Sequence, residues 1–169
     1  MKMNFLPFEN ITYKTSLKED EIIKRLSDCV ETEKRFRIVV FRGETIKPYE
    51  GKINSQAFNI KRIINYRNSF LPRITGNIES DFDGIKIYVK MRLHVFVVVF
   101  LSVWCGIIGI GSIAFLWHAY HNSEVNFAAL IPFGMLIFVY GLSTGGFKYE
   151  SNKSKRDLQE IFQAEIIKE

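Results

Sequence analysis

Side chains that commonly build catalytic and metal centres are scarce in this sequence of 169 residues, which has two cysteines and three histidines. The motifs HExxH, GxxxxGKS/T, CxxC and GxSxG are absent. Cys29 lies in a charged region and Cys105 in an apolar run, so we expect no disulfide. His118, His121 and Glu124 recur at helical spacing, but histidines are common in short loops. We therefore expect no enzymatic activity, no cofactor and no metal ion.

Charge is nearly absent between Val95 and Phe147, where the chain has no Lys or Arg and a single acid, Glu124. Two apolar runs fill this stretch, residues 95–117 and residues 127–147. A membrane-spanning helix needs about 20 mostly apolar residues, because each residue rises only about 1.5 Å. The alternative, a hairpin buried in a soluble core, is less favoured because core helices keep a polar face. We therefore predict a two-helix transmembrane hairpin over residues 93–147.

Basic residues flank the two apolar runs, and the loop between the runs has no Lys or Arg. Positive flanks remain in the cytoplasm of bacterial inner-membrane proteins. The orientation therefore predicts a multi-pass protein of the bacterial inner (cytoplasmic) membrane with both termini in the cytoplasm. The flanking residues are Lys86, Lys90 and Arg92 before the first run, and Lys148, Lys153, Lys155 and Arg156 after the second.

Residues 1–92 are mixed and charged, and we predict that they form a cytoplasmic α+β domain. Apolar residues at helical spacing between Leu17 and Val30 indicate a helix with one apolar face. Alternation of apolar and polar residues from Ile85 to Arg92 indicates a half-buried strand. We expect an antiparallel sheet of five or six strands with this helix packed on it. The predicted strands are Asn10–Lys14, Phe36–Phe41, Tyr49–Asn54, Ala57–Ile63, Arg73–Glu79 and Ile85–Arg92.

Residues 148–169 form the last predicted segment, a cytoplasmic amphipathic helix over Ser154–Lys168. Leu158, Ile161, Phe162 and Ile166 lie near helical spacing and give it an apolar face that could pack on the sheet. The order of strand, helix, strands and final helix resembles a helix-grip fold with the hairpin inserted before its last helix.

A basic segment, residues 59–73, is the candidate ligand-binding region. It contains Lys61, Arg62, Arg67 and Arg73, with Tyr66 interleaved and no acid. Guanidinium groups suit phosphate oxygens, and aromatic rings stack on bases. The first 92 residues have 18 Lys and Arg against 12 Asp and Glu, a net charge of +6. A nucleotide or oligonucleotide ligand, attraction to anionic lipid headgroups and a merely solvated sheet face are the three readings of this segment.

Small residues lie along one side of the first apolar run. Such stripes let helix backbones approach closely. The partner of the stripe would be the second run of the same chain or another subunit, which makes a homo-oligomer an expected assembly. The stripe consists of Ser102, Cys105, Gly106, Gly109 and Ser112.

This layout resembles the small two-pass membrane effectors of bacterial nucleotide-signalling phage-defence systems, which pair a compact cytoplasmic sensing domain with a few spans. It is also similar to two-pass membrane proteins of Bacteroidota-like composition, rich in Lys, Ile, Asn and Phe. The resemblance implies an oligomeric membrane effector or channel whose basic domain binds a nucleotide or oligonucleotide. A non-conducting scaffold or assembly factor, or a protein that binds anionic membrane lipids, is the alternative.

Overall fold

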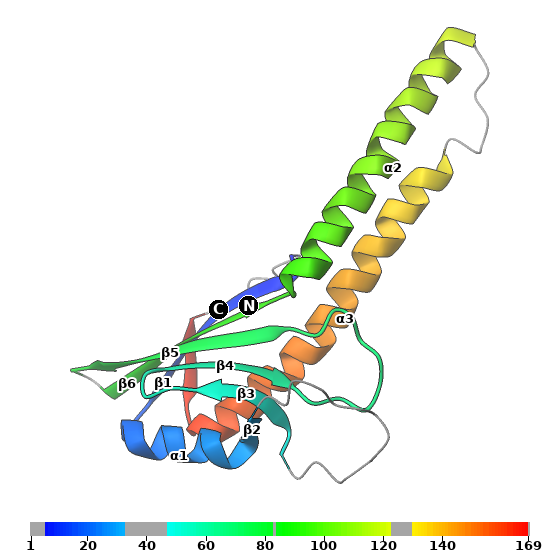
Figure 1. Cartoon of the computed structure of the whole chain (residues 1–169). Coiled ribbons are helices and arrows are strands. Elements are labelled where there is room, and N and C mark those ends of the chain that lie inside the picture. The colour runs from blue at the N-terminus through cyan, green and yellow to red at the C-terminus, as the bar shows by residue number, and fades with distance from the viewer. Residues whose placement is uncertain (1–5, 33–46, 83, 123–129, 169) are drawn as a thin grey trace.

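The computed structural model describes residues 6–32, 47–82, 84–122 and 130–168 (Figure 1). In these residues the chain forms one sheet of seven strands and three helices. The elements in chain order are β1 (Phe8–Thr15), α1 (Glu19–Cys29), β2 (Val30–Thr32), β3 (Tyr49–Ile53), β4 (Ala57–Arg62), β5 (Arg73–Asp81), β6 (Gly84–Arg92), α2 (Val95–Asn122), α3 (Ile131–Phe162) and β7 (Glu165–Lys168).

The sheet is mixed, with the strand order β2-β3-β4-β5-β6-β1-β7. Each neighbouring pair is antiparallel except β2 and β3, which are parallel. The prediction of an antiparallel sheet was therefore wrong at this edge. Parallel strands need a long crossover connection, and residues 33–48 between β2 and β3 provide the length for one. The predicted strand Phe36–Phe41 lies outside the described residues.

Alternation of side chains gives the sheet two different faces. The face covered by α1 and α3 is apolar, and its core side chains include Ile22 of α1 and Phe162 of α3. The Phe162 ring lies 5.7 Å from the ring of Tyr13 and 6.0 Å from that of Phe58, measured between centroids. We call the opposite face, where side chains such as Asn59 are exposed, the open face.

The two long helices extend from one end of the sheet and run side by side away from it (Figure 1). Helix α2 follows β6 after Leu93 and His94. Within the described residues, α2 is the one helix long and apolar enough to cross a membrane, over Val95–His118. Only 6% of its most apolar stretch is buried inside the protein. The structure therefore gives weak support to membrane association.

The predicted two-helix transmembrane hairpin was wrong, because α3 does not qualify as a second span. Residues 127–129 of the second apolar run lie outside the described residues, and the remainder of the run is not apolar enough over the length of a span before Lys148. Beyond that point α3 is polar and passes beneath the sheet, where Glu150 and Ser151 are fully buried.

The predicted C-terminal amphipathic helix was also wrong as a separate element. Helix α3 continues without a break from Ile131 to Phe162, across the predicted boundary at Phe147. It ends where Gln163 adopts a left-handed conformation, with φ of 44°. Ile166, which was expected on the helix, lies in β7, and β7 pairs with β1.

Gly76 of β5 lies directly under the ring of Phe58, and a Cβ atom there would be 2.0 Å from the Phe58 Cζ atom. Gly76→Ala is therefore expected to lower the free energy of unfolding by about 1–3 kcal/mol, the usual cost of overpacking a core. The thermal unfolding midpoint of the purified protein in detergent measures this loss. Gly145→Ala is the matched control, since a Cβ there meets no atom within 4 Å. Equal midpoints for the two variants would contradict the prediction.

Candidate functional site

The sheet divides the basic segment that the sequence singled out. Lys61 and Arg73 are directly opposite each other on β4 and β5 and face the open side. Arg62 is the next residue after Lys61, so its side chain points to the other face of the sheet. There its guanidinium lies 3.1 Å from the carboxylate of Asp157 on α3. The Tyr49 hydroxyl, from the strand beside β4, donates a hydrogen bond of 3.0 Å to the same carboxylate.

Residues 63–72, which connect β4 to β5, contact α3. The Tyr66 hydroxyl donates a hydrogen bond to the fully buried carboxylate of Glu150. The Asn68 amide donates to the Gly146 carbonyl oxygen at 3.2 Å. Tyr66 was predicted to stack on a ligand, and the structure gives it a partner within the chain. Arg67, in the same connection, is exposed to solvent.

A row of three cations crosses the open face at one end of the sheet. Lys61, Arg73 and Arg92 are direct neighbours in register on β4, β5 and β6, and we call them the basic row. Lys61 lies 3.2 Å from the carboxylate of Glu50 on β3. Among residues 6–32, 47–82, 84–122 and 130–168, no acidic side chain pairs with Arg73 or Arg92. Like charges directly opposite each other destabilise a sheet, so an anion bound here would relieve a repulsion.

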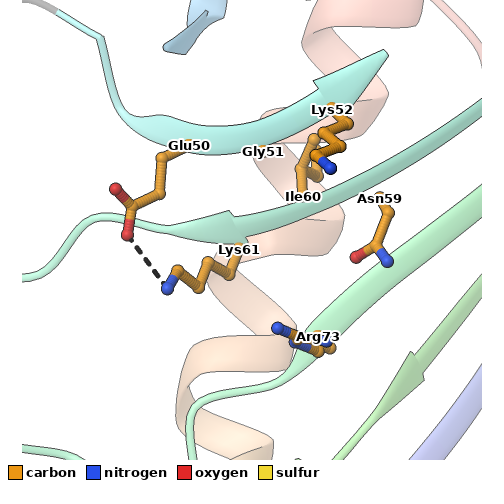
Figure 2. Close-up of a pocket in the computed structure, with 7 residues that line it drawn as sticks. All are labelled: Glu50, Gly51, Lys52, Asn59, Ile60, Lys61 and Arg73. Carbon is orange, nitrogen blue, oxygen red and sulfur yellow. Dashed lines mark ion pairs between the residues drawn. The ribbon is translucent and has the colours of Figure 1, made fainter. Parts of the chain in front are cut away.

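A hollow of about 230 Å³ lies on the open face beside the basic row (Figure 2). Figure 2 shows the Lys61 and Arg73 side chains extending from neighbouring strands, with Lys61 held to Glu50 by the ion pair. The Arg73 guanidinium and the Lys61 ammonium are hydrogen-bond donors, and phosphate oxygens accept hydrogen bonds from both kinds of group. The hollow is lined by Glu50, Gly51, Lys52, Asn59, Ile60, Lys61 and Arg73.

The basic row lies close to the start of α2. Arg92 ends β6, and α2 begins at Val95. The connection between β4 and β5 contacts α3 at Gly146 and Glu150 near the same end of the sheet. The anion-binding candidate is therefore joined by short segments to both long helices.

Sequence reasoning missed Arg92, Lys52 and Asn59 as partners of Lys61 and Arg73. All three lie in strands, at positions whose side chains point to the open face. The signal that could have found them was the same period-two alternation that predicted the strands. Applied to the polar residues, the same alternation places Lys52, Asn59 and Arg92 on the face of Lys61 and Arg73.

Beneath the sheet, Glu9 of β1 ties the sheet to α3. Its carboxylate is 5% exposed and accepts hydrogen bonds from Lys148 and from the Ser151 hydroxyl at 2.6 Å. Lys155 lies 2.9 Å from its second oxygen. Burial raises the pKa of Glu9, but the contacts with Lys148, Ser151 and Lys155 outweigh burial, and the pKa lies below its ordinary value of 4.5. The ionised carboxylate of Glu9 therefore holds β1 to α3.

The residues of the small-residue stripe on α2 are buried to different extents. Ser112 is buried, Cys105 and Gly109 are half-buried, and Ser102 and Gly106 are exposed. A Cβ atom at Gly106 or Gly109 would meet no atom within 4 Å. The described part of the chain thus leaves room at these glycines, and contact with another subunit stays a prediction.

Comparison of the chain with protein families, curated proteins and solved structures finds no match. Function must therefore be inferred from the geometry of the chain itself. The basic row, the hollow beside it and the exposed apolar helix α2 are the features that bear on it.

Proposed function

We propose that this chain is a membrane-anchored effector whose open sheet face binds a phosphate-bearing ligand, a nucleotide or oligonucleotide. The observation that carries the proposal is the basic row of Lys61, Arg73 and Arg92 beside a hollow on an uncovered sheet face. Three adjacent cations share one row, although only Lys61 has an acidic neighbour among the described residues. A ligand with phosphate groups supplies the missing negative charge.

Helix α2 supports the membrane anchor. It exposes a continuous apolar surface from Val95 and Phe96 to Trp117. Soluble monomers rarely expose apolar patches larger than a few hundred Å², and burial in lipid removes this cost. We propose that α2 inserts in the bacterial inner membrane.

Charge near the base of α2 supports a cytoplasmic position for the sheet. Lys90 and Arg92 are exposed on the last strand before the helix, and basic residues beside a span remain in the cytoplasm. Strands β1 and β7, the first and last strands of the described chain, are neighbours in the sheet. We therefore propose that both ends of the chain are cytoplasmic and that α2 embeds its apolar surface in the membrane without crossing it, because α3 returns to the sheet.

An effector also needs a route from the ligand to the membrane. Residues 63–72 start after Arg62 and end before Arg73, so a ligand that draws Lys61 and Arg73 together acts on this connection. Its Tyr66 and Asn68 bind α3 at Glu150 and Gly146. Ligand binding can change α3 only if the ligand favours one arrangement of these contacts over another.

Charge reversal on the open face tests the proposal. Arg73→Glu is expected to weaken binding of inorganic tripolyphosphate and ATP to the purified protein in detergent by about 10-fold or more, because a charge-assisted contact becomes a repulsion. Isothermal titration calorimetry measures both affinities. Arg67→Glu makes the same change in net charge outside the basic row and is the matched control. Equal affinities for Arg73→Glu and Arg67→Glu would contradict a site on this face.

A further inference from the structure

A second hollow lies on the open face, formed by β5 and β6. Its volume is about 310 Å³, and it is lined by Thr75, Asn77, Glu79, Tyr88 and Lys90. The pairing Asn59↔Thr75 connects it to the hollow beside the basic row. A site for phosphate alone would not need the Asn77 amide, the Thr75 hydroxyl and the Tyr88 phenol ring. They are the groups that recognise a nucleobase by hydrogen bonds and stacking.

Tyr88 is the aromatic side chain in this second hollow. It lies near the middle of β6 and is 37% exposed. Its direct neighbours are Asn77 on β5 and Thr12 on β1, which are shorter and polar. The ring therefore has no bulky neighbour in its own row across the sheet. An aromatic ring presented on an open sheet face in this way is a stacking platform for a base.

Cations lie in both directions from Tyr88, but those toward the β5–β6 hairpin, Lys86 and its neighbour Lys14, are accompanied by acids. Lys90 and Arg92 follow on the same strand and the same face, at steps of about 7 Å for every second residue, and Arg73 is directly opposite Arg92. In the other direction, Glu79 faces Lys86, and Asp81 pairs with Lys86. The charges toward the β5–β6 hairpin are thus largely balanced, whereas Arg92 and Arg73 pair with no described acid. A phosphate chain that starts at Tyr88 is therefore attracted toward the basic row.

We propose that Tyr88 and Asn77 form a base-binding subsite, and that the ligand is a single-stranded oligonucleotide. One base stacks on Tyr88 and hydrogen-bonds to Asn77, and the phosphates lie on Lys90 and then on Arg92 and Arg73. This inference rests on the proposed function, since the phosphates occupy the basic row. It adds the requirement for a base, which neither a polyphosphate nor a lipid headgroup has.

The probes that test the subsite are fluorescein-labelled single-stranded DNA hexamers of each base and a base-free hexamer with the same phosphates. Fluorescence anisotropy of the full chain in detergent measures their binding. Tyr88→Leu, which keeps an apolar side chain but removes the π face, is expected to bind the preferred hexamer about 10-fold more weakly. Its affinity for the base-free hexamer is expected to equal that of the wild type. Tyr88→Phe is expected to retain wild-type binding.

Tyr149→Leu is the matched control, because Tyr149 is an exposed tyrosine on α3, the helix that covers the opposite face of the sheet. Wild-type binding of the preferred hexamer by Tyr88→Leu, with weak binding by Arg73→Glu, would overturn the subsite and leave the proposed function intact. Equal affinity of the wild type for hexamers with and without bases would do the same. Binding only to phosphatidylglycerol vesicles, lost in Arg73→Glu, would overturn both in favour of lipid headgroups.

Discussion

Glu9→Gln is expected to lower the free energy of unfolding by about 3 kcal/mol, because removing one partner of a buried ion pair leaves the other without its counter-charge. Here two ammonium groups, those of Lys148 and Lys155, lose the carboxylate between them. Both lysines are partly exposed, which places the effect at the lower end of the usual range. The cluster joins β1 to the middle of α3, so the loss should loosen the attachment of that helix. Chemical unfolding in detergent, followed by near-ultraviolet circular dichroism, measures it.

The pKa of Glu9 also predicts the direction in which the stability of the protein changes with pH. The pKa of Glu9 is lower in the folded chain than the ordinary glutamate value of 4.5. Stability from the ionised carboxylate is therefore fully present above that value and is lost as pH falls through the folded pKa. The wild type should lose stability over this acid range, and Glu9→Gln should lose less because its amide does not titrate.

Glu160→Gln is the control for the same change of charge, since Glu160 is exposed on α3. Surface substitutions of this kind usually change stability by less than about 0.5 kcal/mol. If Glu9→Gln unfolded at the same denaturant concentration as Glu160→Gln, the buried cluster would contribute no net stability.

The central strands could be predicted from the sequence because alternation and turn residues agree there. The apolar members of β6, from Ile85 to Met91, are buried, and its polar members face outward. The hairpin from β5 to β6 occurs between the strands predicted at Arg73–Glu79 and Ile85–Arg92, with Gly84 at φ of 120°. The parallel β2–β3 edge could not be predicted, because β2 has only three residues and follows α1 directly.

Helix α3 was divided wrongly because its buried face is polar. Apolar periodicity fails after Phe147, where Glu150, Ser151 and Ser154 face the interior. Glu150 and Ser151 can be buried because the sheet and its connections supply partners, Tyr66 for Glu150 and Glu9 for Ser151. Such partners are far away in sequence, so no local sequence pattern predicts them.

Only part of the candidate site could be predicted from the sequence, again because strand pairing brings distant residues together. Residues 59–73 were read as one patch, although alternation in β4 sends Lys61 and Arg62 to opposite faces. The register across strands, which brings Arg92 beside Arg73, depends on how the strands pair and not on either sequence segment alone.

Ile107→Lys combined with Ile110→Lys is expected to remove the protein from the membrane. Both isoleucines are highly exposed in the middle of α2, at 66% and 72%. A charge at the centre of a membrane helix costs roughly 2.5–3.5 kcal/mol for insertion, so two should cost about 5 kcal/mol or more. The measurement is the fraction of expressed protein that remains in alkaline-washed bacterial membranes. Ile107→Leu with Ile110→Leu keeps the surface apolar and is expected to remain in the pellet as the wild type does. A double lysine variant that stayed in the pellet as fully as the leucine variant would mean that protein, and not lipid, covers this face of α2.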